Sequence, residues 1–214
     1  MKIGSGKLRG RRIGAPAGRK TRPTSGRLRK ALFDILAPRL QGARVLDLFA
    51  GAGSLGLEAL SRGAHSVVFV ERQRAAAEAI RKNAETLALS ERAAVWRRDV
   101  RSALSALAGE EERFDVIFLD PPYRSALHAK SLERLGSLSL LRPGGIVVTE
   151  HHHKTVLADR YGRLVKHREV RAGESCLTFF REEEIGPDRA GSKTTASLGR
   201  RSPDGELGGR RRLC

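Results

Sequence analysis

Apolar residues follow two different spacings along the middle of the chain. Short, nearly continuous apolar runs predict strands, and the segments between them repeat apolar residues every three or four positions, which is typical of amphipathic helices. The expected strands are 44–49, 66–70, 93–96, 114–119 and 145–149. The expected helices between them are 54–62, 73–89, 100–107 and 127–138. This alternation predicts an α/β fold, with a mostly parallel sheet covered by helices on both faces.

Both ends of the chain depart from this alternation. Apolar residues recur at helical spacing over residues 25–37, which predicts a helix that ends at Pro38. Residues 1–20 alternate glycine with basic and single apolar residues, and this predicts a small β-hairpin with glycines at its turn. Two late apolar runs, 163–170 and 176–180, have no helix between them, so we expect an antiparallel pair at one edge of the sheet.

Charge divides the chain into three parts. The net charge is +17, yet residues 31–185 hold 23 Lys and Arg against 21 Asp and Glu. Residues 1–30 hold 11 Lys and Arg and no acid. We expect a basic N-terminal hairpin or arm at 1–24, a folded domain at 25–184, and a disordered basic tail at 185–214, where apolar residues are scarce. The arm suits a polyanion, because each phosphate that it neutralises releases a counterion.

The composition argues against several classes of protein. No apolar run is long enough to cross a bilayer, so no membrane partner is expected. The basic N-terminus lacks the apolar stretch of a secretory signal. Cys176 and Cys214 are the only cysteines, which argues against a disulfide framework and fits a reducing cytoplasm. We expect a cytoplasmic monomer.

A glycine-rich turn follows the first expected strand. Asp47 lies inside that strand, and Gly51, Gly53 and Gly56 follow at the spacing G-x-G-x-x-G before the next helix. Glycines let the backbone approach a ligand without a Cβ in the way. The spacing alone also fits a dinucleotide site, but a carboxylate four residues before Gly51 suits a cationic amino-acid ligand better than a pyrophosphate.

Two further acids follow the second and third expected strands. Glu71 can accept hydrogen bonds from both hydroxyls of a ribose, and this would serve NAD or S-adenosylmethionine equally well. Asp99 is either an acceptor for an adenine amino group or the N-cap of the helix that starts near Val100. Both interpretations of Asp99 stay open.

The fourth expected strand ends in the tetrad Asp120-Pro121-Pro122-Tyr123. An exocyclic base amine is a poor nucleophile, because its lone pair is conjugated into the ring. The Asp120 carboxylate and the Pro121 carbonyl could accept its two N–H groups, and the two prolines would fix the direction of that carbonyl. Tyr123 offers a ring on which an extruded base can stack. The tetrad therefore predicts methyl transfer to a base amine, a reaction that needs no metal.

The sequence resembles class I methyltransferases and, within them, the RsmD family, the guanine-N2 methyltransferases of bacterial small-subunit (16S) ribosomal RNA. The glycine loop and the tetrad are shared widely among amino-methyltransferases. The opening Gly6–Arg11 also matches, and Arg22-Pro23-Thr24 and the run Glu58–Gly63 are more specific to this family. The resemblance covers about residues 1–182, although the third strand and the 127–138 region match loosely and 183–214 have no counterpart.

The resemblance implies a Rossmann-like, seven-stranded, mostly parallel sheet with its last strand antiparallel, formed by a methyltransferase domain at 25–184. It implies S-adenosylmethionine as methyl donor and, as partner, small-subunit ribosomal RNA or its assembly intermediate. The expected catalytic residues are Asp120, Pro121, Pro122 and Tyr123. The expected cofactor-binding residues are Asp47, Phe49, Gly51, Gly53, Glu71, Asp99 and Thr24. The expected RNA-binding residues are Lys7, Arg9, Arg11, Arg22 and Arg27.

Two alternative functions fit part of this pattern. A DNA adenine-N6 methyltransferase can use the same tetrad, although no insertion resembles a DNA-recognition domain. A non-catalytic RNA-binding factor in ribosome assembly would need the basic arm but not the glycine loop. The histidines at 151–153 do not predict a metal site, since neighbours in an extended chain point to opposite faces. Glu150, just before them, is expected to line the cleft.

Overall fold

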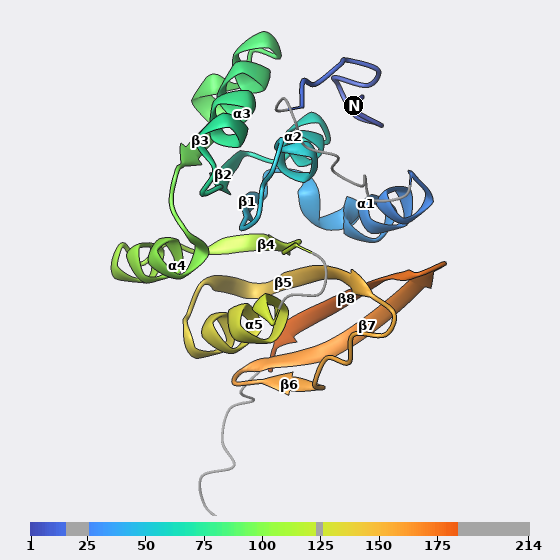
Figure 1. Cartoon of the computed structure of the whole chain (residues 1–214), viewed down its shortest axis with the longest axis vertical. Coiled ribbons are helices and arrows are strands. Elements are labelled where there is room, and N and C mark those ends of the chain that lie inside the picture. Colours follow the sequence, from blue (N-terminus) through green and yellow to red (C-terminus); the bar gives the residue numbers. More distant parts are fainter. Residues whose placement is uncertain (16–25, 123–125, 184–214) are drawn as a thin grey trace, which may run out of the picture. The chain divides into compact units, whose positions relative to one another are not determined.

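The computed structural model describes residues 1–15, 26–122 and 126–183, and these residues form an eight-stranded sheet (Figure 1). The strand order is β3-β2-β1-β4-β5-β8-β7-β6. Five strands are parallel, namely β1 (Arg44–Asp47), β2 (Ser66–Val70), β3 (Ala93–Trp96), β4 (Phe114–Leu119) and β5 (Leu141–His152). The other three, β6 (Arg160–Tyr161), β7 (Leu164–Ala172) and β8 (Ser175–Glu182), pair antiparallel at one edge. The tail expected at 185–214 lies outside the described residues.

This arrangement confirms the α/β class and the antiparallel last strand. The sheet has one strand more than the seven that the resemblance implied. The additional strand is β6, which has only two residues and pairs with the start of β7. Its carbonyl at Tyr161 passes so close to α5 that a Cβ on Gly136 would lie 1.8 Å from it, so a glycine is required there.

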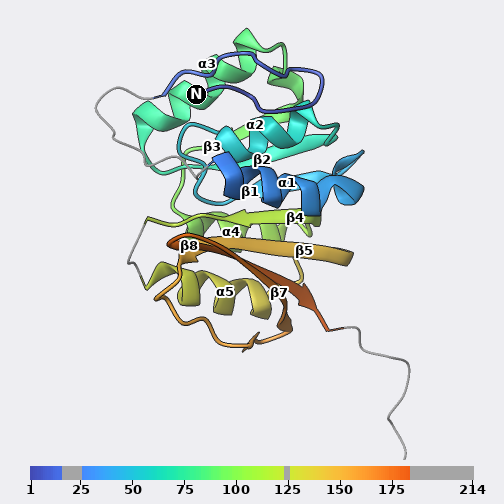
Figure 2. The ribbon, with the colours of Figure 1, turned by 90° about the vertical axis from the view of Figure 1, so that its right-hand side faces the viewer.

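Helices cover both faces of the sheet (Figure 2). α1 (Gly26–Leu40), α2 (Ser54–Ser61) and α3 (Arg74–Thr86) pack on one face, whereas α4 (Val100–Gly109) and α5 (Leu127–Ser137) pack on the other. Alternate residues of a strand supply the two cores: Val116 and Phe118 belong to the first, and Ile117 and Leu119 to the second. None of the described helices is long and apolar enough to cross a membrane.

Several element boundaries differ from the sequence-based expectations. Pro38 lies inside α1 and does not end it. Pro38 cannot donate a backbone hydrogen bond to the residue four before it, but the helix still continues to Leu40, which is buried in the first core. β5 begins at Leu141 and not at residue 145, and α3 ends at Thr86, with Ala88 in the left-handed region at φ 55°.

The first fifteen residues fold back on themselves, as the expected hairpin requires. Backbone hydrogen bonds join Met1 to Ile13 and Ile3 to Arg11 and Gly10, with an antiparallel bridge between Lys2 and Arg12, although no regular strand is assigned in residues 1–15. The segment also docks on α2. The Lys7 backbone N–H donates to the Ser61 carbonyl at 2.8 Å, and a Cβ on Gly6 (φ 81°) would lie 2.0 Å from that same oxygen. The N-terminal segment is therefore held both by its own antiparallel hydrogen bonds and by close backbone contact with a helix.

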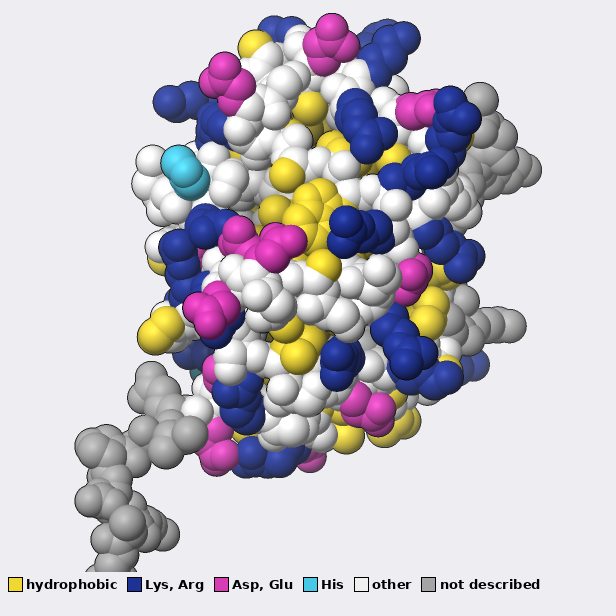
Figure 3. Space-filling view, turned by 90° about the vertical axis from the view of Figure 1, so that its left-hand side faces the viewer, with side chains coloured by type: hydrophobic (Ala, Val, Ile, Leu, Met, Phe, Trp, Pro, Cys, Tyr) yellow, Lys and Arg dark blue, Asp and Glu magenta, His cyan; other side chains and the backbone are white. Residues whose placement is uncertain are grey.

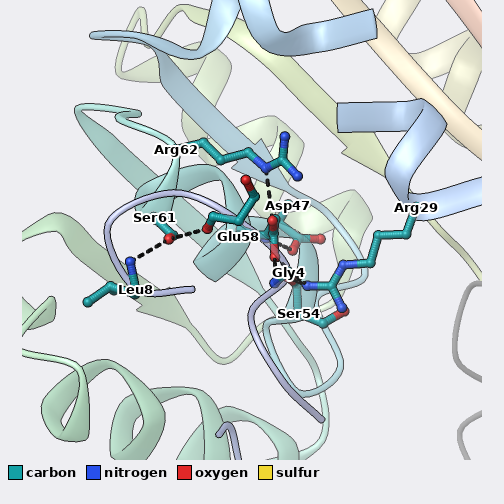
Figure 4. Close-up of polar contacts among 10 residues, drawn as sticks. Gly4, Leu8, Arg29, Asp47, Ser54, Glu58, Ser61 and Arg62 are labelled. Carbon is teal, nitrogen blue, oxygen red and sulfur yellow. Dashed lines mark hydrogen bonds and ion pairs between the residues drawn. The ribbon is translucent and has the colours of Figure 1, made fainter. Parts of the chain in front are cut away.

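A buried carboxylate, Glu58, holds this segment to two helices (Figure 4). It accepts hydrogen bonds from the Gly4 backbone N–H at 2.6 Å and from the guanidinium groups of Arg29 at 3.1 Å and Arg62 at 2.8 Å. Arg29 also donates to the Ser54 carbonyl at 2.9 Å, in the first turn of α2. The N-terminal segment, α1 and the start of α2 are therefore fixed to one another by the Glu58 network.

We expect Glu58→Ala to lower the free energy of unfolding by about 3 kcal/mol, because it leaves two largely buried guanidinium groups without their carboxylate. Urea titration followed by circular dichroism measures this. The matched control is Glu78→Ala, which breaks an exposed ion pair with Arg74 on α3 and should unfold at the wild-type urea concentration. Equal midpoints for Glu58→Ala and the wild type would contradict the assignment.

Candidate active site

A cavity of about 1020 Å³ opens at the carboxyl ends of the parallel strands. Its walls come from the segments that follow β1, β2, β3 and β4 and from the carboxyl end of β5, which is where open α/β sheets bind ligands. The lining residues that the sequence had singled out are Phe49, Gly51, Glu71, Asp99, Asp120, Pro121, Pro122 and Glu150. The structure therefore brings the glycine loop and the Asp-Pro-Pro segment to one cavity, and it confirms that Glu150 lines it.

Three glycines shape the chain between β1 and α2, two through their backbone conformation and one through its lack of a side chain. Gly51 and Gly53 have φ of 56° and 80°, a region that favours glycine. Gly56 lies one turn into α2, where a Cβ would come within 2.2 Å of the Phe69 ring on β2. The loop backbone can therefore turn at the cavity wall while α2 packs closely on the sheet.

Asp47 lies behind this loop and does not line the cavity. Its side chain is 1% exposed, and one carboxylate oxygen accepts from the Gly56 backbone N–H at 3.2 Å. Burial, and secondarily the nearby Glu71 carboxylate, raise the pKa of Asp47 to about 7, although the hydrogen bond from Gly56 acts in the opposite direction. Gly53 is likewise absent from the lining. A direct contact of Asp47 or Gly53 with a cofactor stays a prediction.

Glu71 and Asp99 both face the cavity and also organise the backbone around it. Glu71 accepts from the backbone N–H groups of Gly51 at 3.0 Å and Gln73 at 2.7 Å, so it links the ends of β1 and β2. Asp99 accepts from the Ser102 N–H at 3.1 Å and is the N-cap of α4. The capping interpretation of Asp99 is confirmed, and its place in the lining keeps the adenine interpretation open.

Asp120 follows directly on β4, with Pro121 buried beside it and Pro122 exposed. Burial raises the pKa of Asp120 to about 8, and the carboxylates of Glu150 and Asp47 add to that increase. Tyr123, Arg22 and Thr24 lie outside the described residues, so their predicted roles stay predictions. Carboxylates at this cavity therefore repel one another, and a bound cation would relieve that repulsion.

Basic residues lie at the same cavity, and the sequence analysis did not identify them. They are Arg72, Arg98, Arg101, Lys130 and Arg134. Arg72 and Arg98 could have been found, since each lies just beyond the end of a strand; Lys130 and Arg134 come from α5, whose approach to the cavity is a tertiary feature. Figure 3 shows Lys and Arg spread among Asp and Glu over one face, so cations are available beyond the N-terminal segment.

The predicted RNA-binding residues that the structure describes do not line the cavity. Lys7, Arg9, Arg11 and Arg27 are exposed and absent from its lining, although Met1 contributes to it. Arg11 donates to the Thr86 carbonyl at 3.1 Å, at the end of α3. Because α2 and α3 start at the cavity edge of the sheet and end at the opposite edge, the tip of the N-terminal segment lies at that opposite edge.

The three histidines at the end of β5, residues 151–153, differ in their exposure. His151 is buried, and its Nε2 lies 2.7 Å from the Thr178 hydroxyl, whereas His153 is more exposed and lies next to the Glu174 carbonyl. His152 lines the cavity. Burial lowers the pKa of His151. Among the residues that the structure describes, no three His, Cys, Asp or Glu side chains are grouped to hold a metal ion.

Solved structures with this architecture place the chain in the class I methyltransferase fold. The candidate methyltransferase yhhF of Escherichia coli is 31% identical, with a TM-score of 0.73, over 86% of this chain and 98% of its own. A hypothetical protein of Thermus thermophilus is 35% identical, also with a TM-score of 0.73, over 84% and 98%.

The model of the family described as "Conserved hypothetical protein 95" matches residues 1–181, so the chain belongs to that family. Curated relatives include the "Ribosomal RNA small subunit methyltransferase D" of Escherichia coli, 33% identical over 89% of this chain and 94% of that protein. The protein of the same name from Haemophilus influenzae is 37% identical over 70% and 78%. The expected membership in the RsmD family is therefore confirmed.

The raised pKa of Asp120 predicts that the free energy of unfolding falls as pH rises. Asp120 has a pKa of about 8 in the fold and about 3.9 when unfolded, so the folded protein keeps a proton that the unfolded chain releases between these values. The associated stability is complete below about pH 4 and is lost as pH rises toward 8.

Asp120→Asn removes this titration. Between pH 5 and 7 we expect the free energy of unfolding of the variant, relative to that of the wild type, to increase by up to about 1.4 kcal/mol per pH unit. At pH 9 the variant should be the more stable protein. Urea unfolding at several pH values measures the difference, with the exposed Asp34→Asn on α1 as control. Parallel pH profiles for Asp120→Asn and the wild type would refute the raised pKa.

Proposed function

We propose that this protein transfers a methyl group from S-adenosylmethionine to the exocyclic N2 amine of a guanine in bacterial small-subunit ribosomal RNA. One observation supports this above the others: the carboxylate of Asp120 and the glycine loop of residues 51–56 border the same cavity. The names of the curated relatives agree with this substrate class, and the resemblance to the RsmD family supplies the position on the guanine.

The donor set of the cavity fits the proposed cofactor. S-adenosylmethionine supplies an electrophilic methyl group on a positively charged sulfur and also bears an ammonium group. Carboxylates at Glu71 and Asp120 line the cavity, and Asp47 lies directly behind its wall, so the site offers negative charge to such a cation. Glu71 would accept from the ribose hydroxyls and Asp99 from the adenine amine, with Phe49 and Gly51 completing the wall.

The loop after β4 would hold the target amine. The Asp120 carboxylate and the Pro121 carbonyl accept its two N–H groups, which favours a nitrogen lone pair directed out of the ring plane. Asp120 also accepts the proton that the nitrogen loses once it carries the methyl group. Placing both substrates in one cavity lowers the entropic barrier to their reaction. The predicted role of Tyr123 is to stack on the extruded base.

The basic N-terminal segment would bind RNA outside the target nucleotide. Its exposed Lys7, Arg9 and Arg11, with Arg27 and the predicted Arg22, suit phosphate contacts that set affinity and not base choice. The Glu58 network fixes this segment relative to α2, and α2 begins at the cofactor loop. We propose that the substrate is an assembly intermediate of the small subunit in the cytoplasm.

We expect Asp120→Ala to reduce methyl transfer at least about 100-fold and to weaken cofactor binding far less, since the lost group acts mainly on the amine. Transfer of labelled methyl to small subunits from cells lacking this protein measures activity, and calorimetry with S-adenosylmethionine measures affinity. The control is Asp34→Ala on α1. Wild-type transfer to duplex DNA in place of subunits would refute the proposed substrate, and full activity of Asp120→Ala would refute the assigned residue.

We expect Glu71→Ala to weaken S-adenosylmethionine binding about 10- to 100-fold, because hydrogen bonds to a charged acceptor contribute roughly 1.5–3 kcal/mol. Glu71→Gln, which keeps one acceptor oxygen, should bind with intermediate affinity. The exposed Glu91→Ala, ahead of β3, serves as control. If calorimetry gives one dissociation constant for all of these proteins, Glu71 does not contact the ribose.

A further inference from the structure

Glu150 lies beside Asp120 at the carboxyl edge of the sheet. β4 and β5 are parallel neighbours, and Leu119 pairs with Thr149, so the residues that follow them, Asp120 and Glu150, emerge next to each other. Both line the cavity, and their carboxylates are close enough to interact electrostatically. The two acids therefore form a pair of hydrogen-bond acceptors on one wall.

The backbone at Glu150 is held firmly in place. Its carbonyl oxygen lies 2.9 Å from Nε2 of His128, a buried side chain on α5. Thr149, just before it, is fully buried, and Glu150 itself pairs with Leu177 of the antiparallel strand β8. A side chain anchored between two sheet neighbours and a helix is a better geometric reference for a ligand than one on a loop.

Guanine and adenine present opposite patterns next to their amines. In guanine the N2 amine is followed along the Watson–Crick edge by N1–H, so both are donors. In adenine the N6 amine is followed by N1 with a lone pair, so a donor neighbours an acceptor. An extruded base is recognised through this edge. Two adjacent carboxylates match the guanine pattern and place a negative charge against N1 of adenine.

We propose that Glu150 determines the choice of base: its carboxylate accepts the N1–H of the target guanine while Asp120 accepts from the N2 amine. This inference rests on the proposed function and goes beyond it by naming the residue that separates guanine from adenine. A site built to accept a hydrogen bond rejects a substrate that lacks the donor far more strongly than an apolar pocket rejects a change of shape.

The test compares Glu150→Gln with the wild type on two RNAs. The nucleotide that the wild type modifies is first mapped by mass spectrometry, and the small-subunit RNA is then ligated with guanine or 2,6-diaminopurine at that position. Both bases carry the N2 amine, but N1 of 2,6-diaminopurine is an acceptor. Glutamine keeps the shape of glutamate and can donate to that acceptor through its amide.

We expect the wild type to prefer guanine by at least about 100-fold in kcat/KM, and Glu150→Gln to reduce this preference to about tenfold or less, with diaminopurine methylated faster than by the wild type. Glu133→Gln, an exposed acid on α5, should keep the wild-type preference. A change of the ratio distinguishes recognition from support of the fold, because a purely structural defect slows both RNAs equally.

Equal loss of activity on both RNAs, or an unchanged preference for guanine in Glu150→Gln, would overturn the inference and leave the proposed function standing. A wild type that modifies an adenine, or no base at all, would instead overturn the proposed function, and the assignment of Glu150 with it. The donor site is checked separately, since calorimetry with S-adenosylmethionine should give the same affinity for Glu150→Gln and the wild type within about threefold.

Discussion

Repulsion among carboxylates at one edge of the sheet is the interaction that the rest of the structure has to accommodate. Asp47 ends β1, Glu71 and Asp120 follow β2 and β4, and Glu150 lies near the carboxyl end of β5, so strand pairing keeps these acids at one edge of the sheet. Burial adds to the cost of their charge, so two of them have a pKa near 7 or 8. A protein that only needed a stable fold would gain by replacing them with neutral residues, which is why strongly perturbed acids indicate a ligand site.

Positively charged side chains lie around this cavity and along the N-terminal segment. Cationic side chains such as Arg98 and Lys130 lie at the same cavity as the acids. Their long side chains let the charged groups stay partly in water. Away from the cavity, Glu58 neutralises the charges of Arg29 and Arg62, whose side chains are largely buried. A strongly basic chain can in this way keep several carboxylates together at one cavity.

The sequence was sufficient to predict the alternating elements and most of their limits, because β1 to β4 are apolar on both faces and short. It was sufficient for the glycine loop and the Asp120 segment as well, since their chemistry depends on neighbouring residues. Prediction from the sequence was not sufficient where tertiary contacts determine the local structure. Pro38 stays helical in a helix whose last residue, Leu40, is buried in the core, and the docking of the N-terminal hairpin on α2 was not visible in the sequence.

Some residues of the cavity could likewise be predicted from the sequence, and others could not. Glu150 was expected at the cleft from its place after a strand, but its position next to Asp120 depends on β5 being the neighbour of β4 and not merely the next strand in the chain. Lys130 and Arg134 escaped notice, because nothing in an amphipathic helix indicates which end of it borders a ligand. Local patterns identify chemical groups; sheet order decides which of them meet.

The raised pKa of Asp120 also bears on the order in which two substrates can be used. Near neutral pH the empty site holds a proton on this acid, and a protonated carboxyl is a poorer acceptor for an amine than a carboxylate. A cation bound in the same cavity lowers that pKa by direct Coulomb attraction, so it releases the proton. Within the proposed reaction, binding of the donor thereby prepares the acceptor that the base requires. The crowding of acids that weakens the empty protein at high pH is then the same feature that links the two substrates.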